Sequence, residues 1–240
     1  MSGGAKSSVE EIRDRFDQDV ERFSNLETGQ SATIDAPLAL ELIAEAAAAT
    51  TPGAKEILDV GCGAGNYTLK LIASLPAVGG ATLIDLSRPM LDRAVQRIGA
   101  AAPHVRATAI QGDIREIELG EDRFDVIVAA AVLHHLREDA EWVAVFRKFH
   151  RALRAGGSLW ISDLVAHAMP AVQAMMWRRY GEYLTGLKGE KYRDEVFAYV
   201  QGEDTPRSLG FQMELLKGAG FGAVDVLHKN SCFGVIGAVK

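Results

Sequence analysis

The 240-residue chain has few cysteines, no long apolar run and no strong excess of either charge. Its two cysteines, Cys62 and Cys232, cannot form a disulfide framework or a cysteine-rich metal centre, and reduced thiols favour a cytoplasmic setting. No apolar stretch is long enough to span a bilayer, so no membrane partner is expected. The net charge of −6 provides no general attraction for nucleic acid, so nucleic acid is not expected as a partner.

The most informative stretch is an apolar run, Ile57 to Val60, that ends in a Gly-x-Gly-x-Gly turn and continues into a helical pattern. This order is typical of a buried parallel strand that leads into a helix N-terminus, where open α/β sheets bind nucleotide-like ligands. Gly61 and Gly63 allow positive φ angles and let a ligand approach bare backbone. The alternative is a tight turn without a ligand, although three alternating glycines exceed what such a turn needs.

The spacing of the next signal narrows the ligand. A dinucleotide fingerprint requires a glycine where this chain has Asn66, three places after Gly63. Asp85 ends the next apolar run, 20 residues beyond Gly65, where a carboxylate can accept hydrogen bonds from both ribose hydroxyls. Asp85 could instead be a polar strand end or the N-cap of a helix that starts near Arg88. Together the two signals predict a nucleoside with a diol.

Five motifs follow one another in the order found in one large enzyme family. The chain resembles the class I S-adenosylmethionine-dependent methyltransferases over about residues 55 to 165. The motifs are Leu58–Gly65, Ile84–Ser87, Gly112–Ile114, Phe124–Val128 with Leu133–Leu136, and Leu153–Gly157.

The resemblance implies S-adenosylmethionine as the cofactor and nine positions around it. These positions are Asp59, Gly61, Cys62, Gly63, Asp85, Leu86, Asp113, Ile114 and Ala130. The glycine turn should pack against the methionine end and the ribose, Asp59 should lie near the ammonium group, and Asp85 should hold the ribose hydroxyls.

The remaining positions concern the adenine and the methyl group. Leu86 should lie against the adenine, Asp113 should reach its exocyclic amine, and Ile114 should supply a backbone N–H. The alternative for Asp113 is a turn residue after a glycine. Ala130 ends the fourth strand beside the reactive methyl, and it offers a backbone contact where many members of the family have a polar side chain.

His134 and His135 are the evident candidates for acid–base catalysis. A histidine there could take a proton from an oxygen or nitrogen acceptor. Members of the family carry a similar pair irrespective of the acceptor, so an imidazole could instead pack on the adenosyl group. The sequence shows no catalytic triad and no metal cluster, and none is required, because methyl transfer by in-line displacement depends chiefly on proximity and orientation.

Alternating patterns predict an α/β fold, a doubly wound and mainly parallel sheet with helices on both faces. Strands are expected near residues 56–60, 81–85, 105–111, 124–130 and 158–163, and helices near 66–75, 88–99, 138–154 and 207–218. Runs 223–228 and 232–239, joined by residues 229–231, should form an antiparallel C-terminal hairpin. This makes a seven-stranded sheet, and such an ending resembles the Rossmann-like methyltransferase fold.

The domain organisation follows from these elements. Residues 1–50 are predicted to be an N-terminal helical cap, with helices over 9–25 and 37–49. Residues 51–240 form the methyltransferase domain, with a helical lid insert at about 164–206. The insert carries an apolar-aromatic stripe that could instead be core or the interface of a homodimer: Val172, Met176, Tyr180, Tyr183, Leu184 and Leu187.

The function predicted from these features is transfer of a methyl group from S-adenosylmethionine to a small-molecule acceptor. A faint C-terminal resemblance to the carboxy-S-adenosylmethionine synthases gives an alternative, in which Arg193 or Arg207 would hold the carboxylate. A third hypothesis is a nicotinamide-dependent oxidoreductase. The third glycine of the turn is at position 65 and not at 66, and no Tyr-x-x-x-Lys pair is suitably placed, so both features argue against it. A non-catalytic module that keeps the cofactor site is the fourth.

Overall fold

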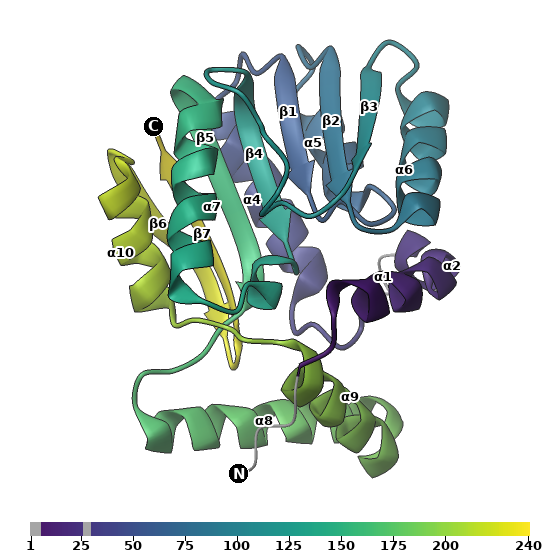
Figure 1. Cartoon of the computed structure of the whole chain (residues 1–240), viewed down its shortest axis with the longest axis vertical. Coiled ribbons are helices and arrows are strands. Elements are labelled where there is room, and N and C mark those ends of the chain that lie inside the picture. The colour runs from purple at the N-terminus through teal and green to yellow at the C-terminus, as the bar shows by residue number, and fades with distance from the viewer. Residues whose placement is uncertain (1–5, 26–29) are drawn as a thin grey trace.

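A seven-stranded sheet runs through the computed structural model, which describes residues 6–25 and 30–240 (Figure 1). The strand order is β3-β2-β1-β4-β5-β7-β6. The strands are β1 (Glu56–Val60), β2 (Gly80–Asp85), β3 (Arg106–Gln111), β4 (Phe124–Ala130), β5 (Leu153–Leu164), β6 (Ala223–Asn230) and β7 (Phe233–Val239). The first five strands are parallel and β7 is antiparallel to both of its neighbours, so the predicted fold class is confirmed.

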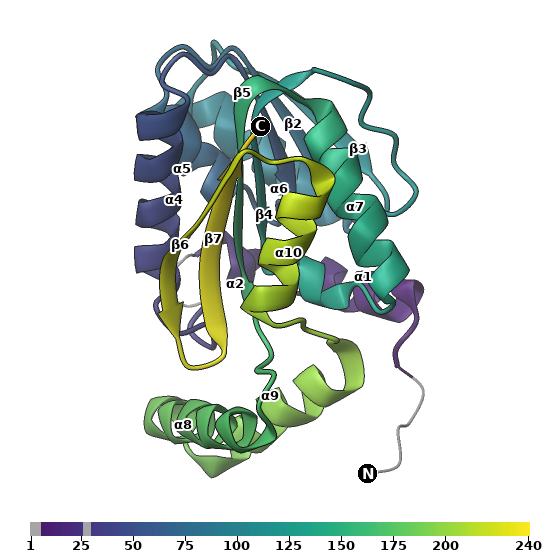
Figure 2. The same ribbon diagram turned by 90° about the vertical axis from the view of Figure 1, so that its left-hand side faces the viewer.

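The helices cover both faces of the sheet and the carboxyl ends of its parallel strands (Figure 2). They are α1 (Val9–Gln18), α2 (Val20–Ser24), α4 (Ala36–Thr50), α5 (Asn66–Ser74), α6 (Arg88–Ala101), α7 (Asp139–Ala152), α8 (Pro170–Lys188), α9 (Glu190–Glu203) and α10 (Leu209–Ala219). Apolar residues of α4, α5 and α6 pack on one face, and those of α7 and α10 pack on the other. Helices α8 and α9 lie below the strand ends, with α1 and α2 beside them.

The glycine turn stands at the point where the strand order reverses. β1 lies between β2 and β4, so the chain leaves it toward one edge of the sheet and later returns on its other side. Ile57, Leu58 and Val60 are buried, as expected for a central parallel strand covered on both faces. Open α/β sheets bind ligands at this kind of switch point, outside the carboxyl ends of the strands.

The C-terminal hairpin has a different turn from the one predicted. Asn230 pairs with Phe233, so Lys229 and Asn230 belong to β6 and the turn is Ser231–Cys232. Ser231 adopts a φ of 49°, and its hydroxyl donates to the carbonyl of Met176 on α8 at 2.8 Å. The sequence could not show this contact, because it joins the hairpin to a helix about 55 residues away.

The N-terminal segment forms two helices where the sequence analysis predicted one. Residues 9–25 were expected to form one helix, but α1 and α2 are separated at Asp19, whose N–H caps the end of α1 by donating to the carbonyl of Phe16. The bend brings the rings of Phe16 and Phe23 to 5.7 Å from each other. Residues 1–5 and 26–29 of the predicted cap lie outside the described residues. Elsewhere, β5 begins at Leu153, earlier than predicted, because α7 already ends at Ala152.

Close packing between β5 and β7 gives a first testable prediction. A Cβ on Gly237 would lie 2.0 Å from the ring of the buried Trp160, so alanine there must displace the indole. We expect Gly237→Ala to lower the free energy of unfolding by about 1–3 kcal/mol, measured by urea denaturation. Gly53→Ala is the matched control, because a Cβ there meets no atom within 4 Å. Equal stabilities of the two variants would contradict this reading of the packing.

Candidate functional site

Three adjoining cavities lie at the carboxyl ends of the parallel strands. The turn cavity is lined by residues 61–64 and by Asp85, Leu86 and Ala130. The distal cavity lies beyond Asp85 and is lined by residues 112–115 together with Val9 and Ile12 of α1. The aromatic cavity, of about 350 Å³, lies between the strand ends and helices α8 and α9 and is lined by several tyrosines.

The glycine turn binds the end of β2 through its backbone. The N–H groups of Gly61 and Cys62 donate to the carbonyl of Ile84 at 2.8 and 3.0 Å. Gly61 and Gly63 have φ angles of 68° and 49°. A Cβ on Gly61 would lie 2.7 Å from the Val132 side chain, whereas one on Gly63 would point into open space. Glycine is thus needed at 61 for packing, and the bare backbone that a ligand can approach is at 63.

Asp85 lies where the sequence predicted it, between the turn cavity and the distal cavity. Its carboxylate accepts from the N–H of Gly63 at 2.8 Å and from the N–H of Ser87 at 2.9 Å. Burial raises the pKa of Asp85, although both N–H groups oppose this shift. A carboxylate offers about four acceptor positions, so these N–H groups leave acceptor capacity for a ribose hydroxyl. The N-cap of α6 is Ser87, so Asp85 does not have the capping role offered as the alternative.

Asp59 lies deeper than the cavities. Its side chain accepts from the hydroxyl and the N–H of Thr68 at 2.6 and 3.2 Å, and it is 1% exposed. Burial raises the pKa of Asp59 to about 7. Among the described residues it does not line any of the three cavities, and it holds the first turn of α5 against β1. Its contact with a cofactor ammonium group stays a prediction.

The distal cavity brings together the three residues assigned to the adenine. Leu86, Asp113 and Ile114 all line it. The carboxylate of Asp113 pairs with the guanidinium of Arg115 at 2.6 Å and accepts from the Arg115 N–H at 2.8 Å. The turn role offered as the alternative for Asp113 is therefore present, and a hydrogen bond to an adenine amine would have to share a carboxylate that Arg115 already occupies.

The turn cavity and the aromatic cavity meet at the end of β4. Ala130, Tyr67, Phe16 and His135 line both of them. Burial raises the pKa of Tyr67 to about 12, so its phenol stays neutral. A ligand that extends along the glycine turn would therefore present its end to the aromatic cavity at Ala130.

The aromatic cavity is lined chiefly by residues outside the sheet. Helices α8 and α9 contribute Tyr180, Tyr192, Val196 and Tyr199. Tyr180 and Leu184 of the predicted stripe are buried, whereas Leu187 is 41% exposed. The stripe is therefore partly core and partly cavity wall. Arg15, Asp19, Arg22 and Glu195 add charge to the lining.

The two histidines form the short 3-10 helix η1 (Leu133–His135) and face different surroundings. Asp163, at the end of β5, accepts from the N–H groups of Leu133 and His134 and from Nδ1 of His134. Burial opposes charge on His134, yet Asp163 and Asp204 outweigh it and raise the pKa of His134 to about 9. Burial and the neighbouring His134 lower the pKa of His135 well below its usual range. His135, not His134, thus has the neutral imidazole that a base requires.

Asp163 and Asp204 are the functional candidates that the sequence analysis missed. Asp163 ends a buried parallel strand, and the rule that such strand ends face the ligand side of the sheet could have identified it. Asp204 follows α9 in the insert, and no pattern in the sequence places it beside η1. Its contact with the histidines is purely tertiary.

The arginines proposed for a carboxylated cofactor lie elsewhere. Arg193 pairs with Asp194 at 2.8 Å, and Arg207 pairs with Asp139 at 2.8 Å. Within residues 6–25 and 30–240, neither arginine lines one of the three cavities. The reading as a carboxy-S-adenosylmethionine synthase is therefore not favoured.

Comparison with known proteins agrees with this geometry. Residues 57–157 match the family model of a methyltransferase domain. The chain is 33% identical over 120 residues to an uncharacterized methyltransferase from Anoxybacillus flavithermus, covering 50% of this chain and 52% of that protein. It is 22% identical over 241 residues to a demethylmenaquinone methyltransferase from Desulfitobacterium hafniense, covering 100% of this chain and 92% of that protein.

A solved structure shares the fold. Human N-acetylserotonin methyltransferase in complex with S-adenosylmethionine superposes with a TM-score of 0.60 at 17% identity, covering 95% of this chain and 56% of that one. Residues 57–157 therefore match a methyltransferase domain, and the resemblance to the class I S-adenosylmethionine-dependent methyltransferases drawn from the five motifs is confirmed. The matched part spans about half the length of the Anoxybacillus relative. No helix in the described part of the chain is long and apolar enough to cross a membrane.

Proposed function

We propose that this protein transfers the methyl group of S-adenosylmethionine to a small, largely apolar acceptor. The observation that carries the proposal is the junction at Ala130, where the turn cavity opens into the aromatic cavity. A cofactor held along the glycine turn, with its ribose on Asp85, would direct its methyl group to this junction. An acceptor in the aromatic cavity would meet it there.

The chemistry is an in-line displacement. A lone pair of the acceptor forms the new bond to the methyl carbon while the carbon–sulfur bond breaks, and sulfur keeps that electron pair as a neutral thioether. The protein has to align the two ligands and exclude water, which is catalysis by proximity and orientation. His135 lies at the junction, so its imidazole is our candidate for the group that orients the acceptor or takes its proton.

The lining of the aromatic cavity supports a compact aromatic acceptor with a hydroxyl or similar nucleophile. Phenol and phenyl rings surround a space of about 350 Å³, near the lower end of the usual range for ligand pockets. The Desulfitobacterium relative is named a demethylmenaquinone methyltransferase, which agrees with an aromatic ring system in the acceptor. We place the protein in the cytoplasm, which its two free, buried cysteines support.

We further propose that α8 and α9 form a lid over the acceptor, with α1 and α2 as its second wall. Tyr180 and Tyr183 donate to the carbonyls of Ala32 and Ser31 at 3.0 and 2.9 Å, which joins the insert to the segment after α2. Both segments line the aromatic cavity.

The direct test has two stages. Calorimetric titration with S-adenosylmethionine should show one binding site per chain. The loaded protein should then be incubated with a panel of phenols, hydroquinones and carboxylic acids, using cofactor with a deuterated methyl group. Mass spectrometry should find the deuterated methyl on an acceptor and S-adenosylhomocysteine as the second product. Failure of the folded protein to bind S-adenosylmethionine would refute the proposal.

The position of the acceptor gives a separate prediction. Val196 lines the aromatic cavity, and Val196→Trp should fill part of it. We expect the KM for the acceptor to rise at least roughly tenfold, while the affinity for S-adenosylmethionine stays the same, because loss of ground-state binding appears in KM. Ala198→Trp on the exposed side of α9 is the control. An equal effect of the two tryptophans would place the acceptor elsewhere.

A further inference from the structure

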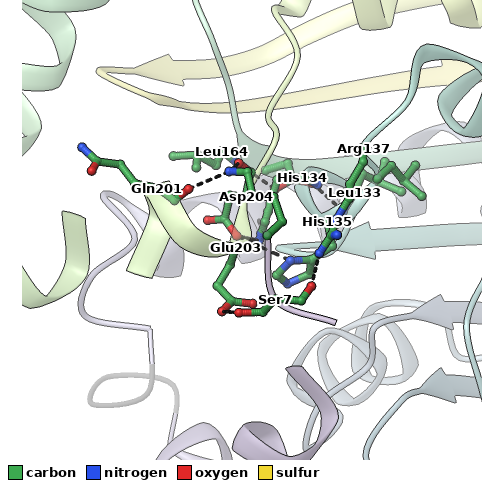
Figure 3. A network of polar contacts seen from close by, with 12 residues as sticks. Ser7, Leu133, His134, His135, Arg137, Leu164, Gln201, Glu203 and Asp204 are labelled. Atoms are coloured by element: carbon green, nitrogen blue, oxygen red, sulfur yellow. Dashed lines mark hydrogen bonds and ion pairs between the residues drawn. The ribbon is translucent and has the colours of Figure 1, made fainter. Parts of the chain in front are cut away.

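Three electron-rich atoms face one another beside the aromatic cavity. They are Nε2 of His134, Nδ1 of His135 and Oδ1 of Asp204, and they all lie within 4.8 Å of one another (Figure 3). Asp204 Oδ1 is 3.6 Å from His134 Nε2 and 3.4 Å from His135 Nδ1. The distance of 3.6 Å between Asp204 Oδ1 and His134 Nε2 is too long for a hydrogen bond.

Two of these atoms are buried without a hydrogen-bond partner among the described residues. They are His135 Nδ1 and Asp204 Oδ1, and Asp204 itself is only 6% exposed. A buried carboxylate oxygen without a donor is costly, so its presence calls for an explanation. The neighbouring Glu203 differs in that its Oε1 pairs with Arg15 at 2.8 Å, although its Oε2 is also buried without a hydrogen-bond partner among the described residues.

We propose that His134, His135 and Asp204 bind a divalent transition-metal ion, with Zn²⁺ the expected occupant. Two imidazoles and one carboxylate form a recognised ligand set for a catalytic metal site with an open position. With bonds of about 2.0–2.2 Å, a tetrahedral ion holds its ligand atoms roughly 3.4 Å from one another, and the two distances from Asp204 Oδ1 are close to this value. An octahedral ion would require a separation nearer 3.0 Å with the same bond lengths.

The surroundings of His134 match those of a metal ligand. Its Nδ1 is bonded to the carboxylate of Asp163, which leaves Nε2 to point at Asp204. The ion would take the place of the proton on Nε2, which would be released to solvent on binding. A ligating histidine is usually held in this way, by a carboxylate or carbonyl on its other ring nitrogen. Asp163 also accepts from the N–H groups of Leu133 and His134, so it holds η1 as a unit.

The open coordination position would face the aromatic cavity, which all three ligand residues line. The fourth ligand would be an oxygen of the acceptor. Only this assignment of the fourth ligand rests on the proposed function. A bound divalent ion lowers the pKa of a coordinated hydroxyl, whose proton would pass to solvent before the oxygen attacks the methyl carbon. With the ion bound, His135 would be a ligand that positions the acceptor through the metal and would not be the base. The sequence alone predicts no metal site, because Asp204 lies 69 residues beyond His135 in the insert.

Metal binding can be measured without any methyl transfer. The protein is dialysed against a chelator and then titrated with Zn²⁺ by calorimetry, in competition with a chelator of known affinity. Co²⁺ is the spectroscopic probe, since its visible absorption is intense in four-coordinate sites and weak in six-coordinate ones. We expect one Zn²⁺ per chain and an intense Co²⁺ spectrum.

Two variants remove ligands and one is a matched control. Asp204→Asn and His135→Gln should each weaken Zn²⁺ binding at least roughly 100-fold, since loss of an outer partner alone costs about 10- to 100-fold. Glu203→Gln makes the same chemical change as Asp204→Asn one residue away and should leave binding intact. Wild-type protein that binds Zn²⁺ no more tightly than Asp204→Asn and His135→Gln, or that gives no intense Co²⁺ spectrum, would overturn the proposal.

Titration of the metal-free protein with S-adenosylmethionine separates this inference from the proposed function. Cofactor binding without Zn²⁺ binding would leave the methyltransferase and remove the metal. Zn²⁺ binding without cofactor binding would support the metal site and refute the methyltransferase. Near-ultraviolet circular dichroism is the measurement that checks whether each variant is folded.

Discussion

Asp85→Ala will weaken S-adenosylmethionine binding by about 1–3 kcal/mol, which is roughly 5- to 150-fold in affinity. The free acceptor positions of its carboxylate lie between the turn cavity and the distal cavity, where the ribose of a bound cofactor would be. Without them the ribose hydroxyls would be buried unpaired. Calorimetric titration of the variant against wild-type protein measures the loss.

The same carboxylate also holds the backbone of Gly63 and Ser87, so a second ligand is needed to separate the two roles. Wild-type protein should bind an analogue of S-adenosylhomocysteine without the 2′-hydroxyl more weakly than it binds S-adenosylhomocysteine itself. Asp85→Ala should bind the two compounds with similar affinity. Asp92→Ala is the control, because that side chain is 58% exposed on the next helix. Unchanged affinity in a folded Asp85→Ala protein would remove the ribose from this site.

Asp163→Asn will lower the free energy of unfolding by about 3–5 kcal/mol, the usual cost of removing one partner from a buried ion pair. Asp163 is 3% exposed and bonds to Nδ1 of His134 and to two N–H groups of η1. The amide of asparagine would place a donor or a weaker acceptor against the imidazole. Denaturant unfolding monitored by circular dichroism provides the measurement.

The control for Asp163→Asn is an exposed ion pair. Glu118 has a side chain that is 77% exposed and pairs with Arg151 at 3.2 Å. Glu118→Gln should change the stability by less than about 1 kcal/mol, as exposed pairs usually do. If Asp163→Asn were no less stable than Glu118→Gln, the carboxylate would not be what holds η1 against β5.

The order of the elements could be predicted from the sequence because local patterns specify it. The apolar runs at β1, β2 and β4 are buried on both faces and read as strands without ambiguity. The errors fall where a distant contact decides the outcome. The turn at Ser231 is held by a carbonyl of α8, and the bend at Asp19 turns Phe16 and Phe23 toward one cavity.

The cofactor side of the site was predictable for a similar reason. The glycine turn and Asp85 follow directly after strands, and the ends of adjacent parallel strands lie together. The sequence therefore determined the fold class and which residues gather around the glycine turn, where we propose that the cofactor binds. It did so because each of these depends on periodicity and spacing within a few tens of residues.

The tertiary structure alone decided what lines the aromatic cavity. Helices α8 and α9 bring their tyrosines over the end of β4, and Asp204 reaches His134 and His135 across a long separation in sequence. The tertiary structure also gave the two histidines different surroundings. His134 lies against Asp163, and His135 lies at the junction of the turn cavity and the aromatic cavity. No local pattern encodes these contacts, because they depend on how an insert without a fixed register packs against the strand ends.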